Sequence, residues 1–246
     1  MNPVVIIPAR MASIRLPGKP LALIAGDPMI VHVLRRAQEA NVGPVVVACG
    51  EQEIADAIIN AGGFAVLTRP DHPSGSDRIW EALQSYDPEN RHDVIINVQG
   101  DLPTIEVSAI KSALVPLSDP DVDISTLVAE ITDPSERDNS NVVKAVTAFP
   151  GNAQVGRALY FSRATVPTGD GPLYHHIGLY AYRRAALERF VALPPGVLEQ
   201  RERLEQLRAL ENGMRIDVAL VDTVPFGVDT PADLERAGHL LAQSGR

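Results

Sequence analysis

The sequence has little of what would place it in several large classes of protein. Cys49 is the one cysteine among 246 residues, which excludes an internal disulfide and a cysteine-based zinc site and is typical of a reducing compartment. It stands in an apolar, strand-like run, so we expect a core residue and not a nucleophile. No apolar run has the length of about 18 residues that a membrane span needs. Met1-Asn2-Pro3 leads directly into a strand-like segment without the charged flank of a signal peptide, so we expect a cytoplasmic protein with no membrane partner.

The sequence also lacks a surplus of cations. Lys and Arg number 22 against 31 Asp and Glu, which gives a formal net charge of −9. This balance argues against a protein that coats nucleic acid, because neutralising the phosphates requires excess positive charge. It leaves room for a small phosphorylated ligand, which needs only a few local cations. Hydrophobic residues at 45% and charged residues at 22% indicate a folded globular chain.

Short apolar runs alternate with helical patterns in the first half of the chain. Such runs are typical of parallel strands that are covered on both faces. Alternation with helices predicts right-handed strand–helix–strand units and a doubly wound α/β sheet. The expected strands are Val4–Ile7, Val45–Ala48, Phe64–Leu67 and Val94–Ile96, and the expected helices start at Pro28 or cover Glu51–Ala61 and Ile79–Tyr86.

The second half of the chain has a different pattern. Four strand-like segments follow one another without long helices between them, at Val122–Val128, Val142–Phe149, Ala158–Ser162 and Ile177–Tyr182. The spacing of Leu204, Leu207 and Leu210 predicts a helix over Val197–Asn212. Thr230-Pro231-Ala232-Asp233 predicts a further helix start, with Thr230 as N-cap.

The loop after the first strand gathers positive charge. Arg10, Arg15 and Lys19 lie within ten residues, and open parallel sheets bind ligands beyond the carboxyl ends of their strands. Three cations and the backbone amides of such a loop can hold a triphosphate. The loop is not a Walker A motif, because Pro20 follows Gly18-Lys19, and no G-x-G-x-x-G occurs. A solvated loop with scattered charges is the alternative.

Two aspartates are candidates for a metal site. Asp101 follows the fourth expected strand, and Asp229 directly precedes the expected helix at Thr230. Such carboxylates can hold Mg²⁺ against ligand phosphates, although an ordinary turn aspartate is the alternative. The polar segment Asp71–Arg78 also follows a strand, and we expect Ser76 to cap the helix after it.

Fewer residues of the second half point to a site. Arg163 lies at a strand end, and His175-His176 starts the next strand. Adjacent strand residues point to opposite faces, so this pair is weak support for a metal. Glu and Arg alternate along Val197–Asn212, which is usual for a solvated helix face.

Several blocks in the same order resemble the 3-deoxy-manno-octulosonate (Kdo) cytidylyltransferases, the CMP-Kdo synthetases, over nearly the whole chain. The blocks are Pro8-Ala9-Arg10-x-x-Ser13-x-Arg15-Leu16-Pro17-Gly18-Lys19-Pro20-Leu21, Pro28–Leu34, Asp71-His72-x-Ser74-Gly75, Asn97-Val98-Gln99-Gly100-Asp101, Tyr160-Phe161-Ser162-Arg163-Ala164, His176-x-Gly178, Leu204-Glu205-Gln206-Leu207-Arg208 and Gly227-Val228-Asp229-Thr230-Pro231. The first block alone resembles sugar nucleotidyltransferases in general, whereas the Tyr160–Ala164 and Leu204–Arg208 blocks narrow the resemblance to this family.

The resemblance implies a nucleotide-diphospho-sugar transferase fold with a mostly parallel, doubly wound sheet and a β-rich dimerisation insertion. It implies Mg²⁺-dependent transfer of CMP from CTP to Kdo, with release of pyrophosphate, for lipopolysaccharide synthesis in a cytoplasmic homodimer. We expect one domain over 1–246. Its parts would be a nucleotide-binding part to about 120, a sugar-binding and dimerisation part over about 121–215, and a metal-site segment with a helix over 216–246.

The resemblance also implies residue roles. Arg10, Arg15 and Lys19 would hold the triphosphate, and Lys19, Arg10, Asp101 and Asp229 would be the catalytic set. Ala9, Ser74 and Arg78 would fix the cytidine, with Gln99 between nucleotide and sugar. Asp101 and Asp229 would ligate magnesium. Arg163, His176, Glu205 and Gln206 would contact the carboxylate and hydroxyls of Kdo.

The chain departs from the family pattern at Leu102, where many members carry Glu, and the loop Thr168–Leu173 is shorter than in some relatives. Two alternatives stay open. One is a cytidylyltransferase for another acidic sugar, such as sialic acid or 8-amino-Kdo. The other is a non-catalytic nucleotide-binding regulator, which the presence of both Asp101 and Asp229 disfavours.

Overall fold

The computed structural model describes residues 1–13 and 15–244, so the last two residues of the expected segment 216–246 lie outside the description. The chain divides into two compact units, one formed by Met1–Ile110 with Pro225–Arg246 and the other by Lys111–Val224. In the part that is described, no helix combines the length and the apolar character that crossing a membrane requires.

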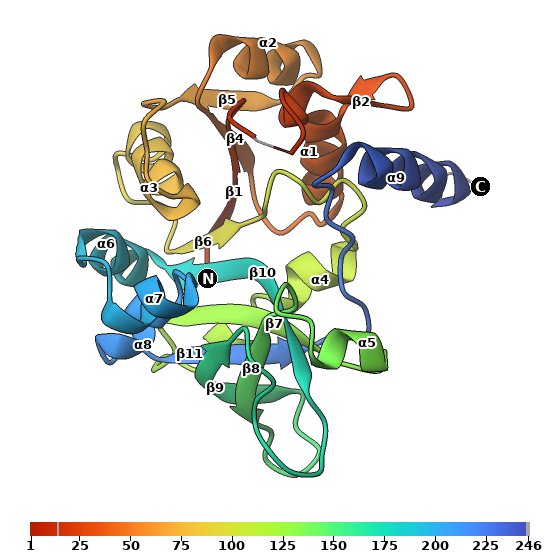
Figure 1. Cartoon of the computed structure of the whole chain (residues 1–246). Coiled ribbons are helices and arrows are strands. Elements are labelled where there is room, and N and C mark those ends of the chain that lie inside the picture. The colour runs from red at the N-terminus through yellow and green to blue at the C-terminus, as the bar shows by residue number, and fades with distance from the viewer. Residues whose placement is uncertain (14, 245–246) are drawn as a thin grey trace. The chain divides into compact units, whose positions relative to one another are not determined.

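A parallel sheet forms the centre of the first unit. Its strands are ordered β5 (Phe64–Leu67), β4 (Val45–Cys49), β1 (Pro3–Ala9) and β6 (Val94–Asn97), and all pair in parallel. The helices between them are α1 (Met29–Glu39), α2 (Gln52–Asn60) and α3 (Gly75–Tyr86). α3 lies on one face of the sheet and α1 on the other, with α2 packed beside α1 (Figure 1). The predicted doubly wound α/β arrangement is thus confirmed for this unit.

The order of the strands places a switch point between β1 and β6. The chain runs outward from β1 through β4 to β5 and then returns to the opposite side of β1 as β6. Right-handed crossovers in two directions put the helices on opposite faces and leave a crevice at the carboxyl ends of the two central strands. The loops that follow Ala9 and Asn97 start at this crevice.

The segment after residue 224 returns to the first unit and ends in α9 (Pro231–Ser244). Val228 and Ala237 are fully buried in a cluster with Ile24 and Met29, against which Leu234 also packs. Ile24 belongs to the short hairpin of β2 (Leu23–Ile24) and β3 (Asp27–Pro28). This cluster fixes the segment that carries Asp229.

The second unit contains a mainly antiparallel sheet in the order β10 (Tyr174–Arg183), β7 (Ile124–Glu130), β11 (Ile216–Leu220), β9 (Val155–Ser162) and β8 (Lys144–Ala148). β11 and β7 are its parallel pair. The helices of this unit include α5 (Pro134–Arg137), α6 (Arg184–Ala192), α7 (Val197–Glu202) and α8 (Leu207–Glu211), and α6 and α8 pack against β10 and β9. The remaining elements among the described residues are η1 (Lys19–Leu21), α4 (Val107–Ser112) and η2 (Pro116–Ser118).

The prediction of one helix over Val197–Asn212 is wrong. Arg203 has φ 57° and ψ 48°, a left-handed conformation that ends α7, and α8 starts only at Leu207. The Glu202 carboxylate accepts hydrogen bonds from Ser162 Oγ at 2.8 Å and the Arg163 amide at 3.1 Å. These contacts with β9 hold the turn and outweigh the helical spacing of the leucines.

Candidate active site

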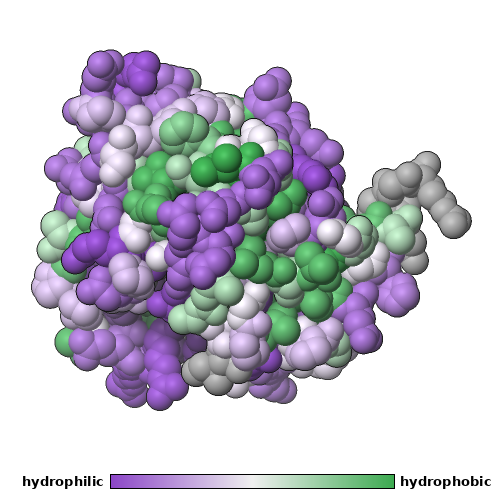
Figure 2. Space-filling model, turned by 90° about the horizontal axis from the view of Figure 1, so that it is seen from above, coloured by the Kyte–Doolittle hydropathy of each residue, from purple (hydrophilic) through white to green (hydrophobic). Residues whose placement is uncertain are grey.

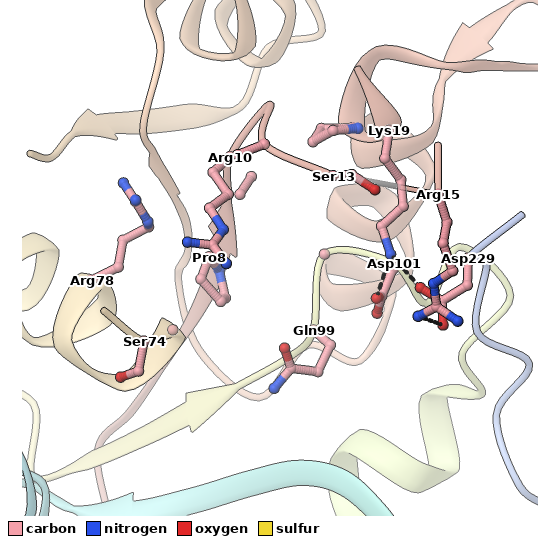
Figure 3. A pocket seen from close by; sticks show the side chains of 15 residues that line it. Pro8, Arg10, Ser13, Arg15, Lys19, Ser74, Arg78, Gln99, Asp101 and Asp229 are labelled. Carbon is pink, nitrogen blue, oxygen red and sulfur yellow. Dashed lines mark hydrogen bonds and ion pairs between the residues drawn. The ribbon is translucent and has the colours of Figure 1, made fainter. Parts of the chain in front are cut away.

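A cavity of about 490 Å³ lies within the first unit, where β1 and β6 end. This volume falls in the range of about 300–1,000 Å³ that is usual for small-molecule sites. Every residue that was predicted for the nucleotide or the metal lines it: Ala9, Arg10, Arg15, Lys19, Ser74, Arg78, Gln99, Asp101 and Asp229. Figure 3 shows Arg15, Lys19, Asp101 and Asp229 grouped at one end, Ser74 and Arg78 at the other, and Arg10 between them.

The loop after β1 turns sharply just before Lys19. Gly18 has φ 68°, in the left-handed region that favours glycine. Its carbonyl accepts a hydrogen bond from the Leu21 amide at 2.9 Å, which closes the single turn of η1. This turn places Lys19 at the start of η1 with its side chain in the wall of the cavity.

The ammonium group of Lys19 joins two distant segments. It donates to Asp101 Oδ2 at 2.8 Å, to Asp229 Oδ1 at 3.1 Å and to the Val228 carbonyl at 2.9 Å. An ammonium has three donors, so all of them are used. Burial lowers the pKa of Lys19, but the adjacent Asp101 and Asp229 raise it by more, so the pKa lies above its usual value. Lys19 is therefore a charged bridge between the two carboxylates.

Asp101 reaches Lys19 because Gly100 lets the segment after β6 come close to the end of β1. A Cβ at Gly100 would lie 2.7 Å from the Pro8 carbonyl oxygen, so a larger residue would push the two segments apart. The Asp101 carbonyl accepts a hydrogen bond from the Val228 amide at 3.0 Å. Both backbone groups of Val228 are thereby bonded, its amide to Asp101 and its carbonyl to Lys19.

Asp229 stands just before a well-capped helix. Asp233 Oδ2 accepts from the Thr230 amide at 2.9 Å, and the Asp233 amide donates to Thr230 Oγ1 at 3.2 Å, which confirms the predicted cap of α9. Asp233 also accepts from the Asp229 amide at 3.1 Å. The Asp229 backbone is thus fixed, while its carboxylate contacts Lys19 and, through Oδ2 at 2.9 Å, Arg15.

The carboxylate pair fits the chemistry of a hard divalent cation. Mg²⁺ is commonly held by one or two carboxylates together with substrate phosphates and water. The side chains of Asp101 and Asp229 are 35% and 45% exposed, so ligands in solution can reach them. Within residues 1–13 and 15–244, no cluster of three or more His, Cys, Asp or Glu side chains could hold a metal by itself. The remaining ligands would therefore come from the phosphates and water.

At the other end of the cavity, Ser74 is the N-cap of α3. Its hydroxyl oxygen accepts from the Asp77 amide at 3.2 Å, and the hydroxyl donates to Asp77 Oδ2 at 2.7 Å. The expectation that Ser76 caps this helix is wrong, because Ser76 lies inside the first turn and is buried.

Arg78 lies in the same wall but is 2% exposed. Its guanidinium donates to Thr68 Oγ1 at 2.6 Å and to the carbonyls of Arg69 at 3.1 Å and Pro70 at 3.2 Å. Burial lowers the pKa of Arg78 from its very high ordinary value. The side chain thus braces the loop between β5 and α3.

The four residues predicted for the sugar all lie in the second unit. Arg163 follows β9 and donates to three backbone carbonyls: Nε to Glu202 at 2.9 Å, Nη1 to Ser140 at 3.1 Å and Nη2 to Arg203 at 3.4 Å. Glu205 and Gln206 follow the same turn between α7 and α8. Arg163 therefore supports the segment that carries two of the other predicted sugar contacts.

His176 lies in β10 among aromatic rings. Its ring centroid is 4.8 Å from that of Phe161 and 5.6 Å from that of Tyr180. Burial lowers the pKa of His176 to about 3, so the ring is neutral at physiological pH. Burial also raises the pKa of Tyr180, and Tyr182 and then Glu205 add to the effect through their negative charge. The structure thus brings Glu205 near Tyr180 and Tyr180 near His176.

Gln206 has a buried donor to satisfy. The residue is 6% exposed, and its Nε2 has no hydrogen-bond partner in the part of the chain that is described. A buried polar group without a partner costs about 1–3 kcal/mol. An acceptor atom of a bound ligand would satisfy this donor.

Comparison with known proteins identifies the family of the chain that carries these residues. The family model described as "Cytidylyltransferase" matches residues 4–216. The 3-deoxy-manno-octulosonate cytidylyltransferase of Paramagnetospirillum magneticum is 66% identical over 241 residues, which cover 98% of both chains. That of Methylobacterium radiotolerans is 68% identical over 240 residues, which cover 98% of this chain and 97% of the relative. The chain belongs to the 3-deoxy-manno-octulosonate cytidylyltransferase family.

Solved structures agree with this membership. A structure of CMP:2-keto-3-deoxy-manno-octonic acid synthetase complexed with CTP superposes with a TM-score of 0.90 at 39% identity, and the match covers 99% of this chain and 100% of that one. The 4-diphosphocytidyl-2C-methyl-D-erythritol synthase of Anaerococcus prevotii matches with a TM-score of 0.65 at 13% identity over 98% of both chains. The second likeness concerns the fold alone. As a cytidylyltransferase the chain is a nucleotidyltransferase, an enzyme class that generally uses a divalent metal.

Leu102 stands where many members of this family carry Glu, and the structure shows its surroundings. In this cytidylyltransferase Leu102 is 8% exposed, and a Cβ on Gly227 would lie 3.7 Å from its Cδ2. Leucine at this position packs beneath the segment that carries Asp229, where a glutamate would need a partner. Cys49 is fully buried, as predicted, and burial raises the pKa of its thiol to about 12.

Three features of this cytidylyltransferase were missed from its sequence. The first is that the Val228 carbonyl accepts a hydrogen bond from Lys19. The second is that the Glu202 carboxylate holds the turn beside Arg163. The third is that Thr126 Oγ1 lies 3.1 Å from His176 Nε2. A backbone carbonyl carries no signal in the residue type. Thr126 stands inside an apolar strand, where a β-branched residue needs no functional reason.

Proposed function

We propose that this chain transfers CMP from CTP to the anomeric 2-hydroxyl of Kdo and releases pyrophosphate, and so supplies CMP-Kdo for lipopolysaccharide synthesis. The convergence of Lys19 with Asp101 and Asp229 in a cavity also lined by Arg10 and Arg15 carries the proposal. This arrangement matches the charge of a nucleoside triphosphate and its metal. The names of the relatives supply the identity of both substrates.

The chemistry asks for positioning and charge neutralisation. The sugar hydroxyl attacks the α-phosphorus in line as pyrophosphate leaves, and no covalent enzyme intermediate is needed. In our proposal Arg10, Arg15 and Lys19 neutralise the triphosphate. Mg²⁺ held by Asp101 and Asp229 would supply Lewis-acid stabilisation of the phosphate charge when bound.

The two remaining groups of residues bind the parts of the substrates that lie away from the reacting atoms. We assign the cytidine to Ala9, Ser74 and Arg78, with Gln99 between nucleotide and sugar, because all four line the same cavity. We assign Kdo to Arg163, His176, Glu205 and Gln206, which the resemblance names and of which Gln206 holds an unpartnered buried amide. The single reduced cysteine favours the cytoplasm, and we propose a homodimer by resemblance to the family.

Nucleotide choice tests the function directly. With Kdo and Mg²⁺ present, pyrophosphate release with CTP should exceed release with ATP or GTP by at least about a hundredfold in kcat/KM. A site that hydrogen-bonds one base leaves buried polar groups unpaired with another. The same assay with sialic acid and 8-amino-Kdo in place of Kdo compares acceptors. Comparable turnover with ATP, or with sialic acid, would contradict the proposal.

Arg163 provides a test of the sugar site. Arg163→Ala should raise KM for Kdo roughly ten- to a hundredfold and KM for CTP about twofold or less. A hydrogen bond to a charged group contributes about 1.5–3 kcal/mol, and the planar fork of Arg suits a carboxylate. Arg201→Ala, which removes an exposed arginine of α7, is the matched control. Equal rises in both KM values would mean that Arg163 only supports the turn through its contacts with Glu202 and Arg203 and does not bind the sugar.

A further inference from the structure

The hydroxyl of Thr126 lies at an irregularity of the sheet in the second unit. Thr126 is fully buried in β7, opposite the point where the pairing of β10 shifts between Ile177 and Tyr180. Its Oγ1 lies 3.0 Å from the Ile177 carbonyl oxygen, 2.8 Å from the Leu179 carbonyl oxygen and 3.1 Å from His176 Nε2. One hydroxyl therefore meets two carbonyls and one imidazole nitrogen.

Only one placement of the protons satisfies all of these contacts. Carbonyl oxygens accept and never donate, so the single proton of the Thr126 hydroxyl must be shared between the carbonyl oxygens of Ile177 and Leu179. If it pointed at His176 instead, two carbonyl oxygens would face the lone pairs of Oγ1 at hydrogen-bond distance without a proton between them. His176 Nε2 must then carry a hydrogen and donate it to Oγ1. In a neutral ring this leaves Nδ1 as an acceptor without a proton.

We infer that Thr126 is a positioning residue that fixes His176 as a neutral hydrogen-bond acceptor through Nδ1, so that His176 receives a hydroxyl of the acceptor sugar and does not pair with its carboxylate. The inference rests on the proposed function for the identity of the sugar, whereas the proton on Nε2 follows from the contacts of Thr126 and the neutrality of the ring from its burial beside Phe161 and Tyr180. A neutral nitrogen that only accepts cannot stabilise an anion. The carboxylate is thereby left to cationic or donating groups.

The surroundings of His176 favour the same state. Phe161 and Tyr180 enclose the ring, and burial in this apolar setting disfavours the imidazolium. A proton on the His175 ring would act in the same direction. Gln206 Nε2, by contrast, is a donor that is unpartnered in the described part of the chain, and it offers the complementary chemistry to an acceptor atom of the ligand.

The state of the ring can be measured without turnover. Long-range ¹H–¹⁵N correlation spectra of the ¹⁵N-labelled, full-length protein at pH 7 distinguish the two neutral tautomers and the imidazolium. His176→Gln identifies the His176 signals by their loss. We expect a neutral ring with the proton on Nε2. A proton on Nδ1, or an imidazolium, would overturn the inference whatever the variants show.

Two substitutions at Thr126 link the ring to the substrate. Thr126→Val keeps the shape and removes the hydroxyl, so the Nε2–H signature should be lost or mixed. KM for Kdo should rise roughly three- to tenfold, the effect of one neutral hydrogen bond, with KM for CTP unchanged. Thr126→Ser keeps the hydroxyl and should retain both the spectrum and KM for Kdo. Ser125→Ala, which removes a neighbouring buried hydroxyl that has no partner within the described residues, is the control and should behave like the parent.

The outcomes separate this inference from the proposed function. A folded parent protein that does not convert Kdo would remove the proposed function, while the spectrum still decides the tautomer. Thr126→Val with parental spectrum and KM would overturn the positioning role. If Thr126→Val does not fold, Thr126→Ser and the parental spectrum decide, and an altered tautomer or raised KM for Kdo in Thr126→Ser would count against the inference.

Discussion

Asp101→Asn and Asp229→Asn are each expected to lower kcat by at least about a hundredfold while the protein stays folded. Asparagine keeps the size of the side chain but loses the charge that a hard dication requires, and a catalytic metal contributes several kcal/mol to the transition state. Both carboxylates are partly exposed and each shares Lys19 with the other. Asp101→Asn removes one partly exposed ion pair, and Asp229→Asn removes two, with Lys19 and with Arg15. Each such pair contributes about 1 kcal/mol or less, so the melting temperature should fall by about 4 °C at most for Asp101→Asn and by about 8 °C at most for Asp229→Asn.

The measurement is kcat as a function of Mg²⁺ and Mn²⁺ concentration for both variants beside the parent. Higher metal concentration should recover part of the loss if the defect is metal affinity. Asp27→Asn is a matched control, because Asp27 is a partly exposed aspartate of the same unit that pairs with Arg35 outside the cavity. It should retain parental kcat. Full activity with unchanged metal dependence in either test variant would remove that aspartate from the site.

The cavity illustrates what a sequence of this kind can predict. Short apolar runs ended in polar loops, and the carboxyl ends of parallel strands meet at one edge of a sheet. Arg10 and Asp101 could therefore be expected near each other although 90 residues separate them. Asp229 was harder to place by physics, since the buried cluster around Val228 that fixes it involves side chains from α9 and the β2–β3 hairpin. The order of the family's blocks supplied that connection.

The errors have a common physical cause. The periodicity of Leu204, Leu207 and Leu210 indicates which residues are buried, and Leu204 and Leu207 are indeed buried. It does not report that Glu202 is held by Ser162 and Arg163 from another strand, which breaks the helix at Arg203. The cap of α3 shows the same limit on a smaller scale, because Ser74 and Ser76 are both plausible caps by residue type. Contacts between distant segments decide these details, and a local pattern does not contain them.

Lys19→Met is expected to change catalysis and metal binding in opposite directions. The ammonium now lies between Asp101 and Asp229 and neutralises both. Its removal takes a cation from the triphosphate, so kcat/KM for CTP should fall at least about a hundredfold. It also leaves two carboxylates close together without their shared counter-charge. Without nucleotide, Mn²⁺ should therefore bind the variant more tightly than it binds the parent.

Titration calorimetry with Mn²⁺ in the absence of CTP, together with steady-state kinetics, measures both effects on the same preparations. Lys111→Met removes an exposed lysine at the end of α4 and should match the parent in both. Methionine fills the volume of the lysine stem, so a fall in activity would reflect the missing charge and not a cavity. The two expected changes separate two explanations. A bridge that only holds Asp101 and Asp229 in place would lose metal affinity together with activity, because the carboxylates would move apart. Weaker Mn²⁺ binding in Lys19→Met would therefore assign Lys19 to the architecture of the loop, whereas tighter binding with lost turnover assigns its charge to the nucleotide.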